Sequence, residues 1–144
     1  MNINNIIIDE IIINALKEDI GTGDITTNTT IDENKTVAGK FIAKEVGILC
    51  GLDVCKRVFE ILDASTEFIA NKKDGETVKT GDIIANVSGN ARSVLTAERT
   101  AINLLQRMSG IATQTSKAVA QIAGTNAKIA DTRKTTPGLR VLEK

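Results

Sequence analysis

A short apolar run near the end of the chain, residues 127–130, stops abruptly at Asp131. A polar stretch with hydroxyls and two cations follows, and then comes the only proline of the chain. The run predicts a short buried strand, and Pro137-Gly138 predicts a turn. Arg133 and Lys134 would therefore lie at the carboxyl end of a strand, which is the edge where α/β folds bind their ligands.

These two cations suit a small polyanionic ligand. Arginine offers a planar fork that matches a carboxylate or a phosphate, and lysine offers a mobile point charge. On spacing alone, an ordinary solvated basic turn is the commoner explanation, because short motifs often match by chance.

Length and composition limit the class of protein. A chain of 144 residues fits one domain, and 42% apolar residues suffice for a core. Only three residues are aromatic, so we expect a mainly aliphatic core. Eighteen basic and eighteen acidic residues cancel, which argues against a general binder of nucleic acid or anionic membranes. We see no secretory signal and no apolar stretch of membrane-spanning length, and we expect a cytoplasmic protein.

Cys50 and Cys55 are the only cysteines, and the chain has no histidine. A pair of cysteines at this spacing, without other soft ligands, is a weak signal for a metal site. Buried structural roles are the better expectation for both thiols.

Hydrophobic spacing predicts helices that alternate with groups of short strands. The predicted segments are a helix over 4–18, strands within 36–50, a helix over 52–63, short strands within 74–89, a helix over 93–108, a second helix that starts at Ser109, and a further helix that opens at 139–144. Ser109-Gly110 should separate two helices, with Ser109 as N-cap and Gly124 as the C-terminal cap of the second. Residues 21–24 predict a structural turn, since no Lys-Ser or Lys-Thr follows as a phosphate loop would require.

The helix predicted over 93–108 carries a polar stripe at steps of three and four residues. Its members are Arg92, Thr96, Arg99, Asn103 and Gln106. Arg99 and Asn103 are one turn apart, so that both side chains can contact one ligand. An ordinary solvated helix face explains the same spacing equally well.

Three segments resemble motifs of the quinolinate phosphoribosyltransferase family. Residues 131–140 read DTRKTTPGLR, which resembles the family's DTRKTxPGLR motif. Residues 18–27 resemble its EDxGxGDxTT segment, and residues 97–113 resemble its AERTxLNxL and SGIAT segments. The three motifs follow the family's order and cover most of the chain.

The resemblance implies an α+β fold. Residues 1–108 would form an N-terminal α/β-hammerhead domain with a barrel-sandwich-like β part. Residues 109–144 would begin a truncated α/β-barrel phosphoribosyltransferase domain, with its first strand at 127–130. The family continues well beyond this length, so the resemblance implies an incomplete chain that is inactive by itself.

The resemblance also implies a reaction of NAD biosynthesis, in which quinolinate and phosphoribosyl pyrophosphate give nicotinate mononucleotide, pyrophosphate and CO2. Arg99 and Arg133 would grip the quinolinate carboxylates, with Arg99 supplied by the partner subunit. Thr132 would add a hydrogen bond, and Lys134 would face the phosphoribosyl substrate. Mg²⁺ would bind through ligands outside this chain, and no residue here is expected to be a catalytic group or a metal ligand. A homodimer or higher homo-oligomer with sites at the subunit interface is expected.

Other functions stay open on the residues alone. The Gly-punctuated strands within 74–89 resemble those of lipoyl and biotinyl carrier domains, with Lys72 or Lys73 as the attachment residue. A dimerisation module, a regulatory remnant and a nicotinate phosphoribosyltransferase are further alternatives.

Overall fold

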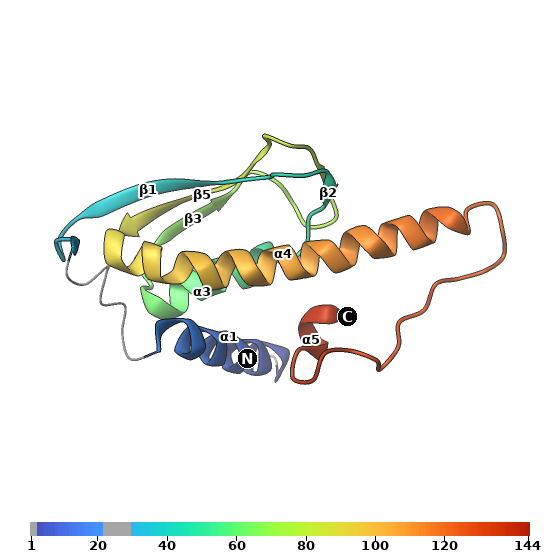
Figure 1. Cartoon of the computed structure of the whole chain (residues 1–144), viewed down its shortest axis with the longest axis horizontal. Coiled ribbons are helices and arrows are strands. Elements are labelled where there is room, and N and C mark those ends of the chain that lie inside the picture. The colour runs from blue at the N-terminus through green and yellow to red at the C-terminus, as the bar shows by residue number, and fades with distance from the viewer. Residues whose placement is uncertain (1–2, 22–29) are drawn as a thin grey trace.

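The computed structural model of the chain describes residues 3–21 and 30–144. Its elements, in chain order, are α1 (Ile3–Ile20), β1 (Thr36–Ile42), β2 (Gly47–Ile48), α3 (Leu52–Leu62), β3 (Glu67–Ala70), β4 (Thr77–Val78), β5 (Ile83–Asn90), α4 (Ala91–Gln121) and α5 (Arg140–Glu143). Figure 1 shows three layers, in which the sheet covers α3 and α4, and these two helices cover α1. The expected α+β fold is confirmed.

The main sheet has the strand order β1-β5-β3, and both pairings are antiparallel. The central strand turns Ala85 and Val87 inward, where Phe41 of β1 lies opposite Ala85 and Phe68 of β3 lies opposite Val87. This alternation of apolar and polar residues is what a half-buried strand requires. Strands β2 and β4 form a separate two-stranded sheet.

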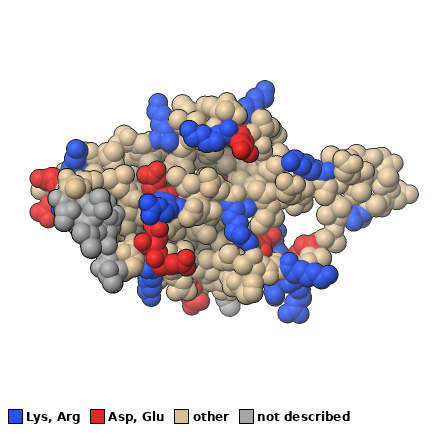
Figure 2. Space-filling view, viewed as in Figure 1, with Lys and Arg blue, Asp and Glu red and all other residues tan. Residues whose placement is uncertain are grey.

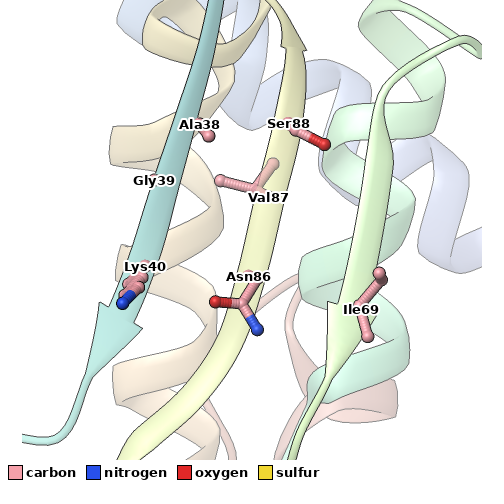
Figure 3. Close-up of a pocket in the computed structure, with 7 residues that line it drawn as sticks. All are labelled: Ala38, Gly39, Lys40, Ile69, Asn86, Val87 and Ser88. Atoms are coloured by element: carbon pink, nitrogen blue, oxygen red, sulfur yellow. The ribbon is translucent and has the colours of Figure 1, made fainter.

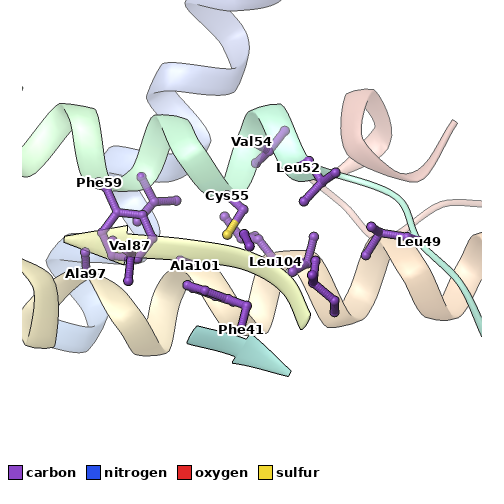
Figure 4. Close-up of a cluster of buried hydrophobic side chains, with 14 of the residues drawn as sticks. Phe41, Leu49, Leu52, Val54, Cys55, Phe59, Val87, Ala97, Ala101 and Leu104 are labelled. Carbon is purple, nitrogen blue, oxygen red and sulfur yellow. The ribbon is translucent and has the colours of Figure 1, made fainter. Parts of the chain in front are cut away.

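The core lies between the main sheet and the helices α3 and α4 (Figure 4). All three phenylalanines meet there, with ring centroids 6.0 Å apart for Phe41 and Phe59, 5.7 Å for Phe41 and Phe68, and 5.9 Å for Phe59 and Phe68. The remaining members are aliphatic, as expected, apart from the fully buried Cys55. Burial raises the pKa of the Cys55 thiol to about 12, which fits the predicted structural role.

The helices α1 and α3 follow the predicted periodicity. Ile12 and Leu16 of α1 are buried, and α3 buries its predicted stripe through Cys55, Val58 and Phe59. The strands predicted within 36–50 and 74–89 are present as well. Of the predicted turn at residues 21–24, only Gly21 is described, and the other three lie outside the described residues. None of the helices in the described ranges is both long and apolar enough to span a membrane.

The predicted break at Ser109-Gly110 is wrong, because α4 continues without interruption from Ala91 to Gln121. Asn90 caps its first turn by accepting hydrogen bonds from the backbone N–H groups of Arg92 and Ser93. The helix also passes the predicted domain boundary between residues 108 and 109, so that division stays a prediction.

Ser109 and Thr113 use their hydroxyls to bind the backbone next to β2. Ser109 Oγ accepts from Cys50 N at 3.0 Å and donates to Cys50 O at 3.2 Å. Thr113 Oγ1 accepts from Ile48 N at 2.8 Å and donates to Ser109 O at 2.7 Å. Gly47 permits this approach, because a Cβ there would lie 2.9 Å from Thr113 Oγ1. The serine therefore joins two elements instead of capping a helix.

The strand predicted at residues 127–130 is also wrong. These residues are exposed and irregular, because the described part of the chain offers no neighbouring strand to complete a ladder there. The chain turns at Gly124, whose φ of 83° is in the left-handed region, close to its expected role as a cap. It then returns to the body of the molecule at α5, where Leu142 is buried.

Candidate functional site

The basic motif at residues 131–140 lies in the segment between α4 and α5 (Figure 1). Several of its polar groups have partners within the segment. Asp131 pairs with Lys144 at 2.6 Å, and Thr132 Oγ1 accepts from the backbone N–H of Lys134 at 3.1 Å. Thr135 Oγ1 accepts from Arg140 Nε at 3.2 Å. These contacts are local, and they fold the motif upon itself.

The side chains of Arg133 and Lys134 differ from those of their neighbours because they have no polar partner among the described residues. Both residues are exposed, and neither side chain has an ion pair or hydrogen bond to any residue that the structure describes. Figure 2 shows Lys and Arg side chains gathered beside α5, where this segment runs. The two predicted substrate-binding cations are thus available to an anionic ligand.

Arg99 lies elsewhere in the molecule. It is on α4 with its side chain 73% exposed, and it pairs with Asp19 near the end of α1 at 3.3 Å. Figure 1 shows α5 beside the opposite, amino-terminal end of α1. Within one chain, the structure therefore does not bring Arg99 together with Arg133 and Lys134.

Arg107 of α4 holds the basic segment and was not predicted from the sequence. Its Nε donates to Glu143 Oε1 at 2.9 Å, while its Nη2 donates to the same oxygen and to Thr136 Oγ1. Glu143 Oε2 in turn accepts from the backbone N–H of Thr136 at 2.9 Å. One indirect signal for this contact was available in the sequence, namely the helix predicted at 139–144. This helix packs on the core through Leu142, and the packing brings Glu143 against α4.

These contacts change the acidity of the Glu143 carboxyl. Its side chain is only 9% exposed. The N–H of Thr136, the guanidinium of Arg107 and the hydroxyl of Thr136 together lower its pKa from 4.5 to about 2. Glu143 is therefore a carboxylate throughout the physiological range.

Residues 3–21 and 30–144 contain no group of three or more His, Cys, Asp or Glu side chains that could hold a metal. Asp131, the acidic residue of the motif, is paired with Lys144. Cys50 is half-buried, and burial followed by the nearby charge of Asp74 raises its thiol pKa.

A shallow hollow of about 180 Å³ lies on the outer face of the main sheet (Figure 3). Its lining residues are Ala38, Gly39, Lys40, Ile69, Asn86, Val87 and Ser88. Lys40 is the one cation in this lining, so the hollow lacks the clustered positive charge that a polyanion needs. Of the two candidate carrier lysines, Lys72 is occupied by an ion pair with Asp82 at 3.3 Å.

Comparison with known proteins identifies the relatives of this chain. The family model described as quinolinate phosphoribosyl transferase, N-terminal domain, matches residues 24–109, and the corresponding C-terminal domain model matches residues 111–144. The probable nicotinate-nucleotide pyrophosphorylase [carboxylating] of Bacillus subtilis is 46% identical over 127 residues, which are 88% of this chain and 44% of that protein. The chloroplastic nicotinate-nucleotide pyrophosphorylase [carboxylating] of Arabidopsis thaliana is 46% identical over 131 residues, 90% of this chain and 37% of its own length.

Solved structures agree with these matches. NadC from Streptococcus pyogenes superposes with a TM-score of 0.91 at 42% identity, over 95% of this chain and 49% of that one. The nicotinate-nucleotide pyrophosphorylase of Francisella tularensis gives a TM-score of 0.90 at 38% identity, over 97% and 49%. The chain thus spans about half the length of the solved structures, and less than half of the curated relatives named above.

Proposed function

Because the chain belongs to the quinolinate phosphoribosyltransferase family, we propose that the protein containing it is a pentosyltransferase of NAD biosynthesis. It joins quinolinate to phosphoribosyl pyrophosphate and releases nicotinate mononucleotide, pyrophosphate and CO2. The relatives named as nicotinate-nucleotide pyrophosphorylases support this assignment.

One observation carries the proposal at the level of the site. In the described structure, Asp131, Thr132 and Thr135 each have a hydrogen-bond or ion-pair partner within the segment, while the side chains of Arg133 and Lys134 are unpaired and exposed. Quinolinate has two carboxylates, and the second substrate has several phosphate charges. Arg133 offers a fork to a carboxylate, and Lys134 offers a compact charge to the phosphoribosyl group. The hydroxyl of Thr132 can still donate its proton, because Oγ1 only accepts from Lys134 N.

A second copy of the chain supplies Arg99 in this proposal. Arg99 lies near the end of α1 that is opposite to α5, so it cannot complete a carboxylate clamp within its own chain (Figure 1). Its pairing with Asp19 is exposed and long, and such pairs contribute only about 0–1 kcal/mol. A carboxylate ligand can therefore replace Asp19, and a homodimer with shared sites follows.

The reaction needs stabilised anions more than a nucleophilic side chain. The ring nitrogen of quinolinate forms a bond to the ribose carbon while the bond from that carbon to the pyrophosphate oxygen breaks. The carbon–carbon bond to one carboxylate then breaks, CO2 leaves, and the ring carbon takes up a proton. Fixed cations lower the barriers by stabilising negative charge as it develops. A magnesium ion and a cytoplasmic location stay predictions, and no step is drawn through the metal.

We test the proposal with Arg133→Ala in the protein that contains this chain. Removing a charge-assisted contact from a water-poor site costs about 2–5 kcal/mol, so kcat/KM for quinolinate should fall by tens- to thousands-fold. Formation of nicotinate mononucleotide measures the effect. Arg57→Ala removes an arginine that binds Asp9 and makes no contact with the basic segment among the described residues, and it should keep near-normal kinetics. Normal kinetics in Arg133→Ala would remove Arg133 from the site.

A further inference from the structure

The segment that carries Arg133 and Lys134 has local contacts, such as those of Lys144 with Asp131 and of Arg140 with Thr135, but no regular secondary structure. Residues 122–139 contain no helix or strand in the described structure, and Ile129 within them is 48% exposed. The chain is anchored again only at α5, where Leu142 is buried in the core. Long flexible cations on such a segment would present their charge in many places, and ordering them costs conformational entropy.

One side chain outside the segment makes polar contacts with it. Among the side-chain hydrogen bonds described between residues 122–144 and the rest of the chain, all come from Arg107. Its guanidinium bridges the Glu143 carboxylate and the Thr136 hydroxyl, and Glu143 also accepts from the N–H of Thr136. The backbone is thereby fixed at Thr136, two residues after Lys134.

We propose that Arg107 is a positioning residue, which acts through Glu143 and Thr136 to set where Arg133 and Lys134 present their charges to the anionic substrates. The inference rests on the proposed function. Arg107 itself need not touch a substrate, because its Nε and Nη2 donors are used by Glu143 and Thr136. Fixing a binding group in its productive place is a large source of affinity and rate, and small displacements remove it.

The geometry favours a forked cation at residue 107. Two donors of one planar guanidinium reach two acceptors from different parts of the segment, which a lysine cannot match. The Glu143 side chain is 9% exposed against 44% for Arg107, so water screens the pair only in part. The lowered pKa of Glu143 is consistent with a persistent contact.

Hydrogen exchange measured by mass spectrometry tests the first half of the proposal. Arg107→Met and Glu143→Gln should raise the exchange rate of peptides covering 131–138 by about tenfold, since a lost charge-assisted contact lets the segment open. Peptides from α3 and β5 should not change. Arg57→Met is the matched control, because it removes a forked contact between α1 and α3 and should leave 131–138 unchanged. Unchanged exchange in Arg107→Met overturns the proposal.

Steady-state kinetics of the protein that contains this chain test the second half. Arg107→Met should raise KM for quinolinate by about tenfold with a smaller effect on kcat, and Arg107→Lys should restore part of the loss. Faster exchange with unchanged KM would show a purely structural contact and would also overturn the proposal. If the unsubstituted protein forms no nicotinate mononucleotide, the proposed function fails, and the exchange experiment still decides whether Arg107 holds the segment.

Discussion

Individual charged residues of this chain divide into those that hold the fold and those left for a ligand. Arg57 of α3 donates from Nε to Asp9 Oδ1 and from Nη2 to Asp9 Oδ2, both at 2.8 Å, and so joins α3 to α1. Arg133 and Lys134 have no such partner among the described residues. Whether a charged side chain has a partner is therefore a better guide to function here than the number of charges, because the basic and acidic residues sum to zero net charge.

The Asp9 carboxylate should make stability depend on pH. Its hydrogen bond from Arg57 lowers its pKa below the ordinary 3.8, against an opposing effect of burial. The unfolded chain binds this proton more readily, so the carboxylate stabilises the fold above pH 3.8 and loses that effect as the pH falls through the lowered value. Urea unfolding of Asp9→Asn should show a deficit against the parent chain at neutral pH that shrinks in acid. Glu10→Gln is the control, and a deficit independent of pH would contradict the prediction.

At the scale of elements, the joint between α4 and β2, formed by hydrogen bonds between α4 and the backbone at and after β2, allows α4 to continue past Ser109. The hydroxyls of Ser109 and Thr113 bind the backbone at Cys50 and Ile48, and Gly51 makes room for Met108 beside them. Gly51 also has a φ of 104°, which is in the left-handed region that favours glycine. Side-chain hydrogen bonds thus keep α4 continuous through residues whose local preference is to break a helix.

Thr113→Val should destabilise the chain by about 1–3 kcal/mol, because the partly buried N–H of Ile48 loses its acceptor while the side-chain shape is kept. Thr113→Ser retains the hydroxyl and should lose much less. Thermal unfolding followed by circular dichroism compares the two variants with the parent chain. Equal melting temperatures for Thr113→Val and the parent would show that this hydrogen bond does not stabilise the joint.

Local sequence patterns predicted the elements that show a regular apolar face or are bounded by turn residues. The helical spacing of apolar residues in α1 and α3, the apolar face of β1 and the Gly-containing turns around β4 and β5 were enough to place them. The break at Ser109 failed because its hydroxyl binds a residue 59 positions away. The strand at 127–130 failed because a ladder needs a neighbour that the described chain does not provide.

The candidate site was predicted only where its signal is local. The cations at 133 and 134 are part of one contiguous motif, so their sequence neighbours already mark them. Arg107 meets Glu143 across 36 positions and Thr136 across 29, and no periodic pattern connects them. Their contact depends on the packing of α5 against the rest of the fold, which no local sequence pattern encodes.

At the scale of the whole molecule, the predicted substrate-binding residues occupy two separate regions. Arg99 lies over the end of α1 near Asp19, and the basic segment lies beside α5. A site that uses both regions therefore needs two copies of the chain, as proposed above.

Mixed dimers test this arrangement directly. Proteins that contain this chain with Arg99→Ala or with Arg133→Ala should each be nearly inactive. Mixing them after partial unfolding should restore part of the activity, because a hybrid dimer has one site with both arginines intact. The ratio of hybrids is measured by native mass spectrometry with differently tagged chains. Hybrids that form without recovery would mean that Arg99 serves its own chain or has no role.

The contact among Phe41, Phe59 and Phe68 also gives the molecule an optical property. The chain contains no tryptophan and no tyrosine, so these three rings are its only aromatic chromophores. All three pack against one another where β1, α3 and β3 meet. Near-ultraviolet circular dichroism, which depends on fixed aromatic packing, therefore reports on this one joint and on nothing else in the chain. A tryptophan placed elsewhere would report on its own surroundings without any background fluorescence from the core.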